Sequence, residues 1–140
     1  MNNKFLLGGL AGAVVSFLLG MVIYGMLMGD YMNANMMSGL GRSEDSMIMW
    51  AMIVGNIGFG LTSSLVIGKW AGSRTFMSGL QNGALFGIVS CLGYEFMMYG
   101  WSNMYNNMNV MFADFAISAV MSAITGGVVA WVWGMGKAAE

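Results

Sequence analysis

Residues 5–29 read FLLGGLAGAVVSFLLGMVIYGMLMG, and this uncharged stretch decides the fold. A helix needs roughly 20 apolar residues to cross the hydrocarbon core of a bilayer, at a rise of about 1.5 Å per residue. The apolar part of a cleaved signal peptide is shorter, about 7–15 residues. We therefore interpret the stretch as a retained transmembrane helix.

Three more apolar stretches of spanning length follow, at residues 47–68, 76–101 and 110–136. The composition agrees with a lipid environment, because the 140 residues are 58% hydrophobic and only 8% charged, against about 25% charged residues in a soluble domain. Helices suit such stretches because they satisfy every backbone polar group internally. The sequence predicts an all-α fold, an integral membrane four-helix transmembrane bundle formed by one domain over residues 1–140.

The basic residues predict an orientation. Lys4, Lys69, Arg74 and Lys137 fall at the two chain ends and in the second loop, which four spans place on one side of the membrane; Arg42 falls on the other side. Cytoplasmic loops carry an excess of lysine and arginine. We expect a multi-pass protein of a bacterial inner (cytoplasmic) membrane with both termini in the cytoplasm.

Small residues recur at every fourth position of each predicted helix. This spacing places them on one helix face, where they let helix backbones approach closely in lipid. It predicts packing of the bundle, or packing between copies of the chain. The predicted packing residues are Gly8, Gly12, Gly20, Gly60, Gly79, Gly83, Gly87, Ser118, Ser122 and Gly126.

Polar residues continue these faces toward the outer side: Tyr24, Asn56, Glu95 and Asp114. Glu95 and Asp114 lie on helices joined by a short loop, which makes these helices antiparallel neighbours. Both carboxyl groups fall roughly 6–9 Å below the outer interface, counted at 1.5 Å per residue. We expect the two groups to face each other, with Tyr24 and Asn56 as hydrogen-bond partners.

Two interpretations of this pair are open. Charge within a bilayer is costly, and like charges close together disfavour each other, so at least one carboxyl should be protonated, or the two should share a proton or a cation. Such a pair can serve as a proton or cation site. It can equally be a neutral, hydrogen-bonded link between helices, or a carboxylate that reaches interfacial water.

Methionine is unusually frequent, with 18 residues, most of them toward the outer side. Thioethers are soft ligands that suit Cu(I), but methionine is also a flexible apolar filler. The outer methionines are Met26, Met28, Met32, Met36, Met37, Met47, Met49, Met52, Met97, Met98, Met104, Met108 and Met111.

The residue types in the sequence do not indicate a catalytic site. There is no histidine, and the one cysteine, Cys91, falls in the middle of a predicted helix. Histidine is the usual general base and metal ligand near neutral pH. We expect a non-catalytic protein without cofactor or bound metal. The near-zero net charge of −1 offers no basic face for nucleic acid.

The chain resembles a family of small bacterial four-span membrane proteins known only as a domain of unknown function. The likeness rests on apolar, glycine-rich segments and covers nearly the whole chain. It implies the fold and a membrane location, but no activity and no site residues. The segments are KFLLGGLAGAVVSFLLGMVIYGMLM, WAMIVGNIGFGL, GLQNGALFGIVSCLGYEFMMYG and ITGGVVAWVWGMGK.

Three functions remain open from the sequence. The first is a module that assembles with itself or with a larger membrane complex, because the chain is nearly all span with short loops. The second is a proton- or cation-coupled carrier that uses Glu95 and Asp114. The third is Cu(I) handling on the methionine-rich outer face. For all three functions we expect the protein to lie in the lipid bilayer. For the first function we also expect contacts with copies of the chain or with partner subunits of a larger membrane complex.

Overall fold

The computed structural model describes residues 3–37, 42 and 44–135, and this part of the chain is all-α. Four helices are long and apolar enough to cross a membrane, which confirms the predicted fold class. The predicted bounds differ from the observed ones by at most two residues. The four spans are Asn3–Leu27, Met49–Trp70, Phe76–Trp101 and Met108–Gly134.

Two of the spans change helix type along their length. The first begins as α1 (Asn3–Gly20) and continues as a π-helical segment, Met21–Leu27. The second begins as α3 (Met49–Ser63) and continues as a π-helical segment, Ser64–Trp70. The other two spans, α4 (Phe76–Trp101) and α5 (Met108–Gly134), are α-helical throughout. A short helix, α2 (Gly29–Asn35), follows the first span.

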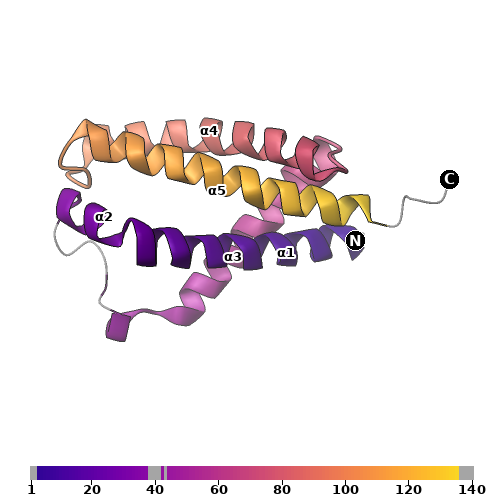
Figure 1. The fold of residues 1–140 in the computed structure, drawn as a ribbon, viewed down its shortest axis with the longest axis horizontal. Coiled ribbons are helices and arrows are strands. Elements are labelled where there is room, and N and C mark those ends of the chain that lie inside the picture. Colours follow the sequence, from indigo (N-terminus) through magenta and orange to yellow (C-terminus); the bar gives the residue numbers. More distant parts are fainter. Residues whose placement is uncertain (1–2, 38–41, 43, 136–140) are drawn as a thin grey trace.

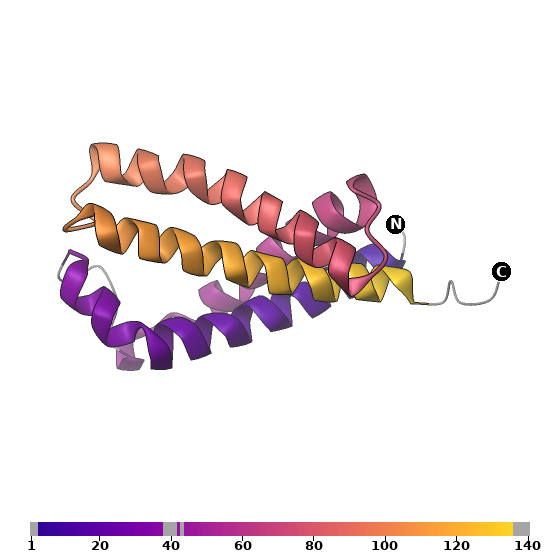
Figure 2. The same cartoon turned by 45° about the horizontal axis from the view of Figure 1, so that its top comes forward.

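Helices α4 and α5 lie antiparallel and side by side, and α1 runs along α5 (Figure 1, Figure 2). The start of the first span contacts the end of the last span. Lys4 Nζ donates hydrogen bonds to the carbonyl oxygens of Trp133 (3.1 Å) and Met135 (2.7 Å). The start of the first span and the end of the last span therefore lie at the same end of the molecule, as four spans require.

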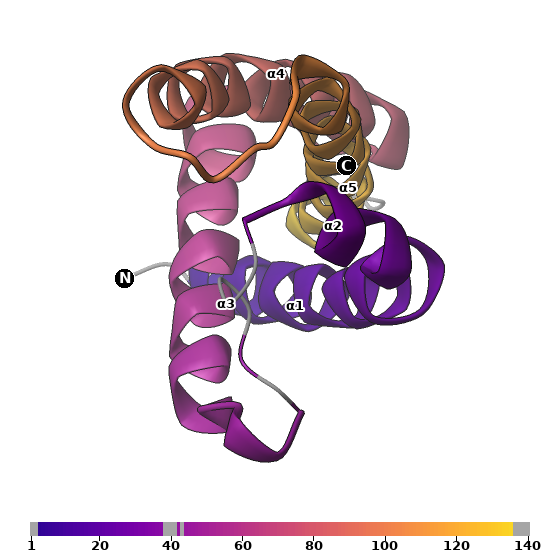
Figure 3. The ribbon, with the colours of Figure 1, turned by 90° about the vertical axis from the view of Figure 1, so that its left-hand side faces the viewer.

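Helix α3 departs from a parallel bundle. It crosses α1 at a steep angle, and its first turns lead away from α4 and α5 (Figure 3). The crossing point is close, because a Cβ atom placed on Gly60 would collide with the backbone of Gly9 and Ala13. On the N-terminal side of this crossing point, the residues from Met49 to Gly55 are exposed on all faces of the helix.

The α4–α5 contact is made through backbone. A Cβ atom on Gly126 would lie 2.6 Å from the carbonyl oxygen of Gly79 and 2.8 Å from Cα of Gly83. On Gly87 it would lie 2.6 Å from Cβ of Ser122. The sequence of α4 and α5 thus permits a spacing that any larger side chain would prevent.

The remaining predicted packing residues are distributed less evenly. Gly8 faces Ser64 and Trp133, and Gly12 faces Val129; in each case a Cβ atom added to the glycine would lie 2.9 Å from side-chain atoms of these neighbours. Gly20 is looser, since the nearest atom to such a Cβ is the terminal carbon of Met121 at 3.8 Å. Close packing is therefore concentrated toward the end that holds the chain termini.

Candidate functional site

The two carboxyl groups predicted from the sequence meet at the far end of the bundle. Glu95 on α4 is 3% exposed, and Asp114 on α5 is 9% exposed. The start of α5 is fixed by Asn107, whose side-chain oxygen accepts a hydrogen bond from the Val110 backbone N–H. This N-cap sets where the first two turns of α5 begin, and Asp114 lies on the second turn.

A third residue, Tyr105, links the two carboxyl groups. Its hydroxyl oxygen lies 2.8 Å from Asp114 Oδ2 and also within hydrogen-bonding distance of Glu95 Oε2. Tyr105 belongs to the α4–α5 loop but is only 6% exposed. The loop therefore folds back into the end of the bundle and places a hydroxyl between the two acids.

Tyr105 is held there by pairing with the segment after α2. Met36 and Tyr105 form an isolated antiparallel bridge. The Met37 N–H donates to the Met104 carbonyl oxygen at 2.9 Å, and the Asn106 N–H donates to the Asn35 carbonyl oxygen at 3.1 Å. The two connecting segments thus close the end of the bundle over the carboxyl pair.

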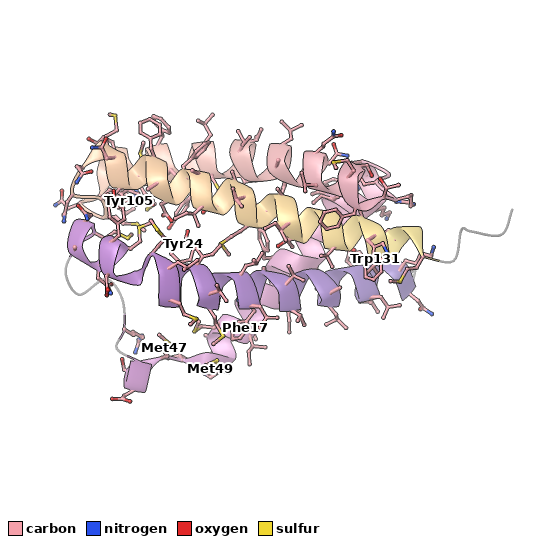
Figure 4. All side chains as sticks on the ribbon, viewed as in Figure 1. Phe17, Tyr24, Met47, Met49, Tyr105 and Trp131 are labelled. Atoms are coloured by element: carbon pink, nitrogen blue, oxygen red, sulfur yellow. The ribbon has the colours of Figure 1, made fainter. Side chains whose placement is uncertain are left out.

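Tyr24 completes the network from the first span. Its hydroxyl donates to Asp114 Oδ1 at 2.5 Å and lies 3.4 Å from Ser118 Oγ. Tyr24 sits in the π-helical segment Met21–Leu27, and π-helical turns are uncommon and often occur at functional sites. Figure 4 shows Tyr24 and Tyr105 near each other at the end of the bundle away from the termini.

Tyr105 is a neutral phenol under physiological conditions. Burial, followed by its hydrogen bonds to Glu95 and Asp114, raises the pKa of Tyr105 above its ordinary value of 10. A neutral phenol has one proton to donate and can also accept hydrogen bonds through its oxygen. This limit on donors bears on how its two partners are hydrogen-bonded.

The geometry around Tyr105 favours a proton on the carboxyl pair. Tyr105 has a single proton to donate, yet its oxygen lies within hydrogen-bonding distance of both acids. Both contacts are full hydrogen bonds when one acid donates to the phenol oxygen while the other accepts from it. The arrangement therefore suits one proton shared by the pair, buried between α4 and α5.

Apolar side chains surround this network. The buried residues Met32, Val110 and Met111 pack with Tyr105 in one cluster. Tyr24 and several half-buried side chains pack against it: Met28, Met36, Met98, Met104 and Ile117. The carboxyl pair is thus screened from bulk water and lipid on the sides formed by this cluster.

Asn56 does not join this site, and its grouping with the carboxyl pair is corrected. Its Oδ1 accepts a hydrogen bond from Ser16 Oγ at 2.8 Å, and its Nδ2 donates to the Met52 carbonyl oxygen at 2.9 Å. It lies on the rim of an apolar groove between α1 and α3. The inclination of α3 explains the difference, because it carries Asn56 toward α1 and away from α4.

Within the described residues, no three His, Cys, Asp or Glu side chains are close enough to hold a metal ion together. No family model, curated protein or solved structure matches the chain. The resemblance to a family of unknown function therefore stays a prediction.

Proposed function

We propose that the chain is a non-catalytic, proton-coupled carrier of the cytoplasmic membrane, with Glu95 and Asp114 as its proton-binding pair. The observation that carries this proposal is the Tyr105 hydroxyl between two buried acids. It leaves one proton shared by the pair, and such a proton can move between acids without rearrangement of the helices. Assembly with copies of the chain or with other subunits stays a separate prediction.

The surroundings of the pair favour a proton over a hard metal cation. Both oxygens of Asp114 and one oxygen of Glu95 face tyrosine hydroxyls. A Ca²⁺ or Mg²⁺ ion needs about six oxygen ligands, which would have to replace these hydrogen bonds. Protons can bind while the tyrosines stay in place.

For orientation, we propose that the end with the chain termini is cytoplasmic. Lys4, Lys69 and Arg74 lie at this end, while Arg42 lies on the connection between the first two spans; Lys137 lies outside the described residues. The excess of basic residues favours this side as the cytoplasmic one. The carboxyl pair then lies near the extracytoplasmic side.

Cysteine labelling tests this orientation. In a Cys91→Ala background, Asn106→Cys should react with an impermeant thiol reagent in intact cells, because Asn106 is exposed at the carboxyl end. Ala71→Cys, exposed at the other end, should react only after the membrane is permeabilised. Labelling of Ala71→Cys alone in intact cells would show the inverted orientation.

Proton movement in liposomes tests the proposed activity. Under an imposed membrane potential, wild-type protein should acidify the lumen, as reported by an internal pH dye. Glu95→Gln and Asp114→Asn should each reduce this rate at least about tenfold, since an amide cannot take up and release the shared proton.

The matched control is Asp30→Asn, which removes an exposed carboxyl from α2 at the same end of the molecule. It should acidify the lumen at the wild-type rate. Wild-type liposomes no faster than empty ones, or equal rates for all four proteins, would contradict the proposed activity.

A further inference from the structure

Three methionines meet at a hollow on the end of the molecule that carries the carboxyl pair. The hollow has a volume of about 360 Å³ and is open to the surroundings. It receives residues from the segment after α2, from the last turns of α4 and from the α4–α5 loop. Its lining residues are Met37, Tyr94, Met98, Ser102, Asn103 and Met104.

Backbone contacts fix where these methionines lie. Met37 and Met104 are directly joined, since the Met37 N–H donates to the Met104 carbonyl oxygen. The Ser102 hydroxyl donates to the carbonyl oxygen of Met98 at 2.7 Å, and the Met104 N–H donates to Ser102 Oγ at 3.3 Å. One hydrogen-bonded turn therefore connects all three residues, and the hollow is part of the ordered fold.

The three methionines are only partly used in packing. Met98 and Met104 pack against the buried cluster around Tyr105, yet both also line the open hollow. Met37 is 45% exposed. Three methionines from three separate segments thus line one open cavity.

We propose that Met37, Met98 and Met104 form a binding site for a soft monovalent cation, Cu(I) or its analogue Ag(I). Thioether ligands select Cu(I) over hard cations such as Ca²⁺ and Mg²⁺. Of the basic side chains, Lys4 and Arg74 lie at the opposite end of the bundle, where both contact Trp133, and Arg42 lies on the connection between the first two spans. The hollow and the carboxyl pair lie at the same end of the molecule, since Glu95 precedes Met98 by one helical turn on α4.

Competition for Cu(I) tests the site directly. Full-length protein in detergent is titrated against a chromophoric Cu(I) chelator under reducing conditions, and native mass measurement with Ag(I) gives the stoichiometry. We expect one ion per chain. The triple variant Met37→Leu, Met98→Leu, Met104→Leu keeps the apolar volume but removes the thioethers, so its affinity should fall at least tenfold.

The matched control replaces three exposed methionines elsewhere, Met26→Leu, Met49→Leu and Met97→Leu, which are 80%, 48% and 58% exposed. It should bind as the wild type does. If the triple variant loses helical signal, Met37→Leu alone serves instead and should weaken binding several-fold.

A wild type that takes no Cu(I) from the chelator would overturn the site, as would equal losses in the variant and its control. Adventitious binding to any methionine would give that second result. The proton proposal is judged separately with Met37→Leu alone, because the Met37 side chain is 45% exposed and lies outside the cluster around Tyr105. This variant should retain wild-type proton movement in liposomes.

Discussion

Gly126→Leu and Gly83→Leu are each expected to destabilise the fold severely. The obstacles to a side chain at these positions are backbone atoms: the carbonyl oxygen of Gly79 and Cα of Gly83 lie 2.6 and 2.8 Å from a Cβ on Gly126. Backbone cannot swing aside as a side chain can, so α4 and α5 must separate. The expected loss in free energy of unfolding is about 3 kcal/mol or more, at or above the usual cost of overpacking.

Unfolding in mixed detergent micelles with increasing denaturing detergent, followed by circular dichroism, measures this loss. Gly93→Leu is the matched control on the same helix, because a Cβ on Gly93 meets no atom within 4 Å. The control should unfold close to the wild type. Similar losses at Gly83 and Gly93 would show that the substitutions act through helix propensity or lipid contact, and not through the α4–α5 interface.

Tyr105→Phe is expected to have the second-largest effect. The change removes only a hydroxyl, but that hydroxyl bonds to both Glu95 and Asp114. Loss of a partner from buried charged groups costs about 3 kcal/mol. The loss should be measurable in the same detergent unfolding assay as for Gly83→Leu.

Tyr24→Phe provides the comparison within the same network. It also removes a hydroxyl from Asp114, but it leaves Tyr105 between the two acids. Its effect should be smaller. An equal or larger loss in Tyr24→Phe would contradict the central position assigned to Tyr105.

The transmembrane spans are predictable because hydropathy and length are local properties. The span expected at residues 76–101, from the apolar run and the polar turn before it, has the bounds of α4. The antiparallel pairing of α4 and α5 follows from their short loop, and this pairing is what brings Glu95 and Asp114 to one level. The small residues of α4 and α5 lie at this contact because their spacing matches one helix face.

Tyr105 is not predictable in the same way. It lies in an asparagine-rich loop, and only its pairing with Met36, across the molecule, turns it inward. The one signal in the sequence is its position: it is the only tyrosine in the loop between the two acid-bearing helices. Such a signal is weak, because an interfacial tyrosine is ordinary in membrane proteins.

Asn56 shows that the depth of a residue in the membrane does not by itself predict its neighbours. It shares a four-residue spacing with Gly60 and lies in the outer half of its span, which suggests a place near the acids. Helix α3 is inclined to α1 and crosses it closely at Gly60. The hydropathy of a sequence does not predict such a crossing angle. Its partner is therefore Ser16 on α1.

Infrared difference spectroscopy across pH tests the shared proton most directly. Wild-type protein should show the C=O stretch of one protonated carboxyl at neutral pH. Glu95→Gln and Asp114→Asn should each remove or shift this band, because each removes one of the two acids that share the proton. A wild type with no protonated carboxyl at neutral pH, or spectra that neither substitution changes, would contradict the account.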